Sequence, residues 1–381
     1  MNSKSFFKQH FSAIVFLICF ILFFYYFVSQ MGLANMLNTL MNTAYRLLID
    51  TCFYLMAIAV LAGAIGALFA EFGVIDLLNK ILSPLMKPLF GLPGVAALGV
   101  VTTYLSDNPA IIALAKDDEF CSCFKKYQLP ALTNLGTSFG MGMIVTTFTL
   151  AQSKLLGSQA LLAAVCGNIG AIVGCIVSTR LLLAYSKKRY SHELIISEEV
   201  IEEKKKEENI SVPLRFMNAL MDGGKRGVDL GLQIIPGVLI ICSIVMMLTF
   251  SAPETGYSGG AYEGIALLPA LAHKFGFVFE FLFGFSHGEC VSVPVTAIGS
   301  AGAALSIIPS LIEDGYATVN DLAVFCAICM CWSGYLSTHV SMMDVLGYKE
   351  LTGKAILYHT IGGLVAGVCA HYLFFLLTSF I

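Results

Sequence analysis

Two apolar segments, near residues 91–116 and 284–312, constrain the fold most strongly because helix-breaking residues interrupt both. Proline removes a backbone donor from a helix, and glycine weakens its hydrogen-bond ladder. Lipid tolerates broken backbone only where it is buried in protein or lines a polar cavity. We therefore expect two re-entrant hairpins rather than two ordinary spans. The interruptions are Leu92-Pro93-Gly94 and Ser106-Asp107-Asn108-Pro109 in the first segment, and Ser292-Val293-Pro294 and Gly299-Ser300-Ala301-Gly302 in the second.

The interruptions belong to an arrangement that occurs twice, in residues 71–185 and 256–378. Each copy has a stretch ending in Phe-Gly, then the interrupted segment, then a short acidic turn and two long apolar segments. Interruptions at matching places in two halves are typical of transporters that bind their solute at mid-membrane.

The composition identifies an integral membrane protein made of helices. Apolar residues make up 57% of the chain and charged residues 12%, and the mean hydropathy is +0.81. Such values with apolar runs of about 20 residues predict transmembrane helices. We expect an all-α protein with about seven transmembrane helices and two re-entrant hairpins in an inverted repeat. The predicted spans are 11–30, 52–70, 129–151, 160–184, 230–250, 319–343 and 355–378.

Charge placement predicts the orientation. With a cytosolic N-terminus and hairpins that each enter and leave on one side, all 22 Lys and Arg residues except Arg46, Lys154 and Lys274 lie in the cytosol, as the positive-inside rule requires. The hairpins then enter from opposite sides. The predicted divisions are an N-terminal signal-anchor helix and connector (1–44), a first repeat (45–186), a charged cytosolic linker (187–216) and a second repeat (217–381).

Polar residues in the apolar segments are the candidate solute- or ion-binding groups, because lipid makes polar groups costly. Asp107 could also cap the second half of its broken segment, and Asn134 could join two helices by a hydrogen bond. His339 could form a proton relay or a structural pair with Asp344. The candidates are Ser106, Asp107, Asn108, Thr133, Asn134 and Thr137 in the first half, and Ser300, Ser333, Ser337 and His339 in the second.

Two groups of residues raise the question of a metal. His287 and Glu289 at the start of the second hairpin are either a polar gate or, with Cys290, three ligands for a transition metal. Cys326, Cys329 and Cys331 could hold a soft metal or simply pack as small apolar side chains. The sequence leaves the metal unknown and predicts no other cofactor.

Three runs give the chain a resemblance to a known family: EFGVIDLL at 71–78, LSPLMKPLFGLPG at 82–94 and GGKRGVDLGLQIIPGV at 223–238. They resemble the Gate, or nucleoside-recognition, domain of concentrative nucleoside transporters, ferrous-iron transporters and spore maturation proteins A and B. The resemblance implies helical hairpins that flank a site, and a bacterial inner membrane.

The function expected from these patterns is secondary transport of a small polar, nucleoside-like solute or an ion. A Na⁺ or H⁺ gradient would drive it, with Asp107 as the first candidate for the coupling carboxylate. The expected partners are the lipid bilayer and the solute, with no nucleic acid; a homo-oligomer is compatible with the sequence. The alternative is a non-transporting protein of the spore-maturation type that acts in the envelope through partners. No His-x-x-Glu-His pattern predicts an enzyme.

Overall fold

The computed structural model describes residues 3–191, 193 and 211–379, and this part of the chain is helical without strands. Most of the predicted linker 187–216 lies outside the described residues. The all-α membrane fold is as predicted.

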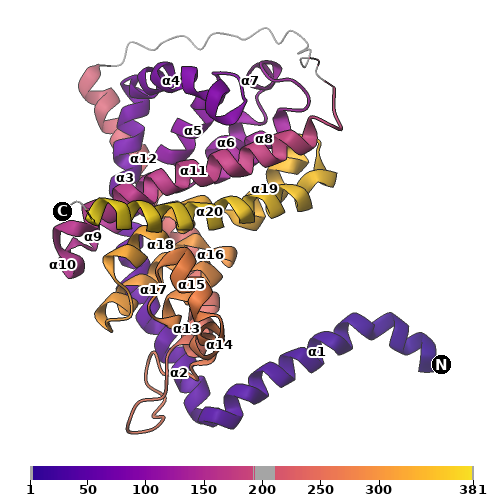
Figure 1. The fold of residues 1–381 in the computed structure, drawn as a ribbon, viewed down its shortest axis with the longest axis vertical. Helices are drawn as coiled ribbons and strands as arrows, with labels where there is room; N and C mark the ends of the chain where they lie inside the picture. The colour runs from indigo at the N-terminus through magenta and orange to yellow at the C-terminus, as the bar shows by residue number, and fades with distance from the viewer. Residues whose placement is uncertain (1–2, 192, 194–210, 380–381) are drawn as a thin grey trace.

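Two long antiparallel helices form one side of the molecule (Figure 1). The first runs through α2 (Leu33–Arg46), a π-helical turn (Leu47–Cys52) and α3 (Phe53–Glu71). The second runs through α12 (Val212–Gly237), a π-helical turn (Val238–Cys242) and α13 (Ser243–Thr249). Their backbones touch where Gly63 meets Gly223 and where Ala59 meets Gly227. Small residues permit this close approach.

A second helix pair crosses the middle of the molecule, where α11 (Ala160–Ser186) and α20 (Thr352–Thr378) lie side by side (Figure 1). Gly174 of α11 packs against Gly362 and Ala366 of α20, so these backbones also approach closely. Helices α4 to α8 lie on one side of the pair, and α13 to α18 lie on the other (Figure 1).

Both predicted hairpins are present. The first consists of α5 (Ala96–Leu105) and α6 (Pro109–Leu114), and the second of α16 (Ser292–Gly299) and α17 (Ala301–Glu313). The two ends of each hairpin lie together. The Gln128 side chain donates a hydrogen bond to the Gly91 carbonyl (3.0 Å), and the Cys290 thiol donates to the Tyr316 carbonyl (3.3 Å).

The hairpins open toward opposite ends of the long helices. Beyond the first hairpin, the Lys126 amide donates to the carbonyl of Glu193, where the linker begins. At the base of the second hairpin, the Tyr316 ring packs on Phe250, just after the far end of α13 (centroids 6.5 Å apart). This is the geometry of an inverted repeat.

Each hairpin is followed by a broken helix. The predicted span 129–151 is α8 (Leu129–Thr137) and α9 (Gly142–Ala151), and the predicted span 319–343 is α18 (Val319–Cys331) and α19 (Tyr335–Val345). The expectation of continuous spans here was wrong. The chain turns through left-handed backbone at Met141 (φ +56°) and Gly334 (φ +63°), which a continuous right-handed helix does not contain.

The described residues contain five helical stretches that are long and apolar enough to cross a membrane. A sixth is obtained if the pair α15 and α16, bent by 72°, is one span. Leu129–Ser186 includes two of the predicted spans, so the count agrees roughly with the expected seven. The stretches are His10–Met31, Leu33–Glu71, Leu129–Ser186, Val212–Thr249 and Lys349–Thr378.

Short helices connect these elements, and several lie near the hairpins. The stretches that end in Phe-Gly stop at left-handed glycines, Gly91 (φ +76°) and Gly284 (φ +72°), which is a common way to end a helix. The short helices are α4 (Val74–Leu85) with a π-helical turn (Met86–Phe90), α7 (Asp118–Ser122), α10 (Ser153–Leu156), α14 (Leu267–Lys274) and α15 (Gly276–Phe283), with 3₁₀ turns at Gly157–Gln159, Gly288–Val291 and Lys349–Leu351.

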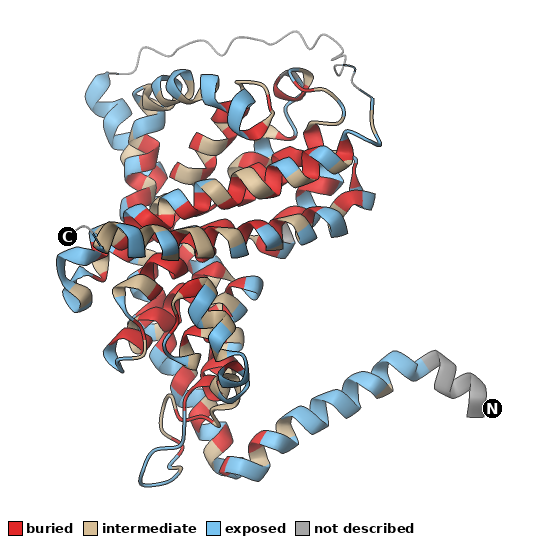
Figure 2. Ribbon diagram, in the orientation of Figure 1, coloured by how far each residue is buried: buried red, intermediate tan, exposed pale blue. Residues whose placement is uncertain are grey.

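Helix α1 (Ser3–Met31) projects away from the rest of the chain and is largely exposed (Figure 2). Near its C-terminal end, Phe27 and Met31 are buried in a small cluster with Met36 and Met247. Its exposed apolar side chains suit contact with lipid.

Candidate functional site

The two hairpin tips and the break between α18 and α19 line one cavity of about 400 Å³. Asp107 and Asn108 come from the first tip, Ser300 from the second, and Ser333 and Gly334 from the break. Ser300 also accepts a hydrogen bond from the Ala303 amide (3.2 Å) and so caps α17. Four of the predicted site residues, one or two from each of three segments, therefore line the same cavity.

Asn108 connects the first hairpin tip to both broken helices. Its amide nitrogen donates to an Asp107 carboxylate oxygen (3.0 Å) and to the Ser333 hydroxyl (3.1 Å). The backbone at Gly140 and at Gly334 passes so close to this amide that any side chain there would collide with it. The amide oxygen is buried, since Asn108 is only 6% exposed, and it has no hydrogen-bond partner within the described part of the chain.

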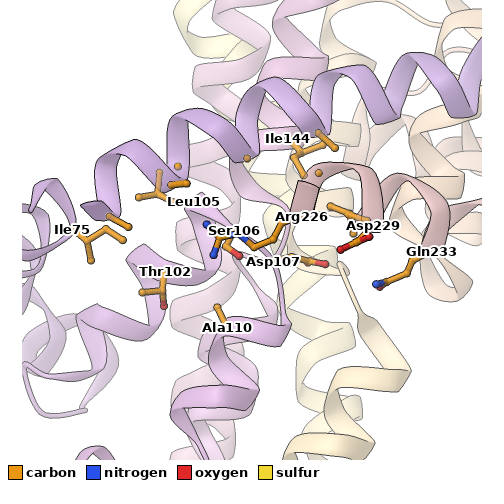
Figure 3. A pocket seen from close by; sticks show the side chains of 17 residues that line it. Ile75, Thr102, Leu105, Ser106, Asp107, Ala110, Ile144, Arg226, Asp229 and Gln233 are labelled. Atoms are coloured by element: carbon orange, nitrogen blue, oxygen red, sulfur yellow. The ribbon is translucent and has the colours of Figure 1, made fainter. Parts of the chain in front are cut away.

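A second cavity of about 410 Å³ lies between the first hairpin tip and the long helices. Figure 3 shows Arg226, Asp229 and Gln233 of α12 opposite Ser106 and Asp107 of the tip. The two cavities adjoin, because Asp107, Leu230 and Gln233 line both.

Arg226, Asp229 and Gln233 were not among the site residues predicted from the sequence. Gly227, the residue after Arg226, packs on Ala59 and Val60, near the middle of the apolar helix α3. These polar side chains therefore lie at membrane depth and not in the linker region. Their spacing of three and four residues on one helix face was the signal that could have found them.

Asn134 and His339 line neither cavity. The Asn134 amide nitrogen donates to the carbonyls of Ser178 (3.4 Å) and Ala355 (3.2 Å), and its oxygen lies 3.2 Å from the His339 ring nitrogen Nε2. This arrangement joins four helices and matches the structural alternative for Asn134. Asp344, the partner predicted for His339, forms an ion pair with Lys349 (2.6 Å).

The remaining candidates lie near the breaks. The Thr137 hydroxyl donates to the Thr133 carbonyl (2.7 Å), and the buried Thr133 hydroxyl has no hydrogen-bond partner. Both residues line neither cavity. Ser337 lies on α19, and its side chain is outside the described part of the structure.

The structure does not assemble a metal site from the predicted groups. His287 contacts the Tyr316 ring (centroids 5.7 Å apart). The Cys290 thiol donates a hydrogen bond to the Tyr316 carbonyl instead of facing a metal position. The Cys331 thiol donates to the carbonyl of Ala171 (3.6 Å). Among the described residues, no group of three or more His, Cys, Asp or Glu side chains is placed to hold a metal ion.

The fold is similar to that of a concentrative nucleoside transporter, CNTnw. A double variant of CNTnw in an outward-facing state aligns with a TM-score of 0.55 and 14% identity over 85% of this chain and 76% of that one. CNTnw in an inward-facing, substrate-bound state aligns with a TM-score of 0.53 and 14% identity over 84% and 74%. No protein-family model matches the sequence, and no curated protein matches it.

Proposed function

We propose that the chain is a secondary transporter that binds a small polar, nucleoside-like solute in the two adjoining cavities at the hairpin tips. The observation that carries the proposal is the convergence of both tips and both helix breaks around Asp107 and Asn108. Broken backbone and charge at membrane depth are costly unless they serve a polar site. The similarity of the fold to CNTnw supports the same conclusion.

The size and position of the cavities suit such a solute. Volumes of about 400 and 410 Å³ fall within the range of roughly 300–1,000 Å³ that small-molecule sites occupy. A third cavity of about 670 Å³ shares Ala67, Ala70 and Arg226 with the second and lies near the start of α12. The three cavities therefore adjoin one another in order from the linker end of α12 to the hairpin tips.

A coupling cation would bind at the first hairpin tip. The Asp107 carboxylate accepts a hydrogen bond from the Asn108 amide nitrogen there, and the amide oxygen of the same side chain has no hydrogen-bond partner in the described ranges. Oxygen ligands from unwound helix segments are how many transporters hold Na⁺ or H⁺. We propose Na⁺ or H⁺ as the driving ion and Asp107 as the coupling carboxylate.

The cellular setting follows as part of the same proposal. We place the chain in a bacterial inner membrane with the linker and the N-terminus in the cytosol, as a member of the Gate, or nucleoside-recognition, family. The first hairpin would then face the cytosol and the second the outside.

Uptake tests the proposal directly. The purified full chain in proteoliposomes should accumulate at least one member of a labelled panel of nucleosides and nucleoside 5′-monophosphates when an inward Na⁺ or H⁺ gradient is imposed. Asp107→Asn removes the coupling charge and should lower gradient-driven uptake about 10-fold or more, the effect expected for a charged interaction. Asp344→Asn is the control, because this carboxylate pairs with Lys349 away from both cavities.

Two results would contradict the proposal. One is that no member of the panel enters the vesicles under any gradient. The other is that Asp107→Asn and Asp344→Asn leave accumulation equally unchanged. A protein that does not transport but loses its cellular function when the linker is deleted would favour the partner-binding alternative.

A further inference from the structure

Arg226 lies where the cavity near the start of α12 adjoins the cavity at the first hairpin tip. It lines both the cavity of about 670 Å³ and the cavity of about 410 Å³. Two other basic residues at this end are already paired: Arg215 with Glu71 (2.6 Å) and Lys225 with Asp222 (3.4 Å). Arg226 has no ion pair or hydrogen bond with any side chain in the described ranges.

Arg226 lies at the level of the apolar helix α3, and its side chain is exposed to the cavities that it lines. Its neighbour Gly227 packs on the backbone of Ala59 and Val60, well inside the apolar helix α3. Charged side chains at such depth are rare and normally face a partner or a water-filled cavity. The guanidinium of Arg226 is therefore available to bind an anionic group of a ligand in the cavity.

The two carboxylates of the same cavity do not supply that partner. Asp107 already accepts a hydrogen bond from Asn108 and lies on the hairpin tip, and Asp229 lies one helical turn from Arg226 on the same face of α12. Neither carboxylate comes within ion-pair distance of Arg226. Residues three apart on a helix are neighbours at roughly 5–6 Å, so the site presents a cationic group and a hydrogen-bond acceptor side by side.

We propose that the transported solute carries an anionic group, a carboxylate or a phosphate, that Arg226 binds. The solute also carries hydrogen-bond donors, such as sugar hydroxyls, that reach Asp229 and the carbonyl oxygen of the Gln233 amide. The inference rests on the proposed transport function and narrows its substrate class. A guanidinium suits this task because its planar fork donates two parallel hydrogen bonds to a carboxylate or a phosphate.

Matched pairs of probes that differ by the anionic group test the inference. The purified full chain is titrated with uridine and uridine 5′-monophosphate, ribose and ribose 5-phosphate, and glucose and glucuronate. At least one anionic member should bind about 10- to 100-fold more tightly than its neutral partner, the ratio expected for charge-assisted hydrogen bonds. Comparison of glucuronate with the phosphates distinguishes the two kinds of anion.

Variants of Arg226 assign the preference to this side chain. Arg226→Gln should weaken the anionic member about 10- to 100-fold and leave its neutral partner unchanged, whereas Arg226→Lys should retain part of the preference. Lys349→Gln is the control, because Lys349 pairs with Asp344 and lines none of the three cavities. Without ligand, Arg226→Gln should melt at the same temperature as the wild type or higher, since an unpaired charge is removed. A lower melting temperature would indicate a structural role instead.

The inference is overturned if no anionic member binds, if both members of every pair bind equally, or if Arg226→Gln weakens both members alike. These results leave the proposed function intact as long as a neutral member is still accumulated in the uptake assay. The proposed function fails separately when no member of any pair is taken up.

Discussion

Asn108 shows how one side chain can determine the backbone around it. Its amide fills the space beside Gly140 and Gly334, so the chain at both positions must pass without a side chain. At Gly334 the backbone is also left-handed (φ +63°), a conformation that glycine adopts at little cost. The identity of these glycines therefore depends on a residue far away in the sequence.

Substitution of Gly334 should separate backbone strain from collision. Gly334→Ala places a methyl group against the Asn108 amide and the Thr338 hydroxyl, and the left-handed backbone adds about 1–2 kcal/mol. Gly347→Ala is the matched control, because Gly347 is also left-handed (φ +79°) but faces open space. We expect thermal unfolding in detergent to show a larger loss of stability for Gly334→Ala, and uptake to fall in that variant alone. Equal losses in the two variants would mean that the contact with Asn108 does not matter.

At the scale of elements, the sequence predicts the hairpins but does not predict the breaks in the helices that follow them. Proline, glycine and charged or amide residues interrupt the hairpin segments, so the hairpins could be predicted. The break after α8 falls at Ser138-Phe139-Gly140, which reads as a continuing apolar helix. At this break the chain contacts the first hairpin tip through Gly140 and Asn108. A contact between residues far apart in the sequence leaves no local sequence pattern. Arg226 and Asp229 of α12 were missed for a different reason, because they precede the predicted span 230–250 and so were not considered as polar residues in an apolar segment.

The loop between α13 and α14 holds a buried carboxylate that ties it to α2. Glu263 is 4% exposed. It accepts hydrogen bonds from the backbone amides of Ser258 (3.1 Å) and Gly259 (3.0 Å), and from the hydroxyls of Ser258 (2.5 Å) and Thr39 (3.5 Å). Burial alone would raise the pKa of Glu263, but these hydrogen bonds outweigh it and hold the pKa below its usual value of 4.5.

This loop should make stability depend on pH. A carboxyl whose pKa is lower in the folded state stabilises the fold above its unfolded pKa, and the contribution is lost as the pH falls through the folded pKa. The wild type should therefore lose stability as the pH falls below about 4.5, whereas Glu263→Gln should be less stable at pH 7, by about 2 kcal/mol, and should change less in acid. Glu254→Gln, an exposed glutamate of the same loop, should follow the wild type. Melting curves from pH 7 to pH 3.5 measure the difference, and parallel curves for the wild type and Glu263→Gln would rule out this role.

At the scale of the whole molecule, the two halves are related by inversion. The base of the first hairpin lies beside the start of the linker, and the base of the second lies at the far end of α13. A membrane around the apolar helices would therefore separate the two bases. The sequence predicted this inversion from the distribution of Lys and Arg, because positive charge sorts loops by side.

Thiol labelling in intact cells tests the inverted arrangement. In a background with the exposed Cys19 and Cys123 replaced by serine, a membrane-impermeant reagent should label Asp314→Cys from outside. Lys80→Cys and Lys125→Cys should react only after the cells are opened. Asp314 follows the end of α17 and Lys125 follows α7, so each reports one hairpin base. Labelling of all three positions from the same side would exclude the inverted fold.

The single amide of Asn108 has a mechanical consequence for the whole chain. It touches the first hairpin and the kinks of two helices that come from different halves. A displacement of the first hairpin tip would carry this amide away from both kinks, so the packing of the two halves against each other depends on the position of one hairpin.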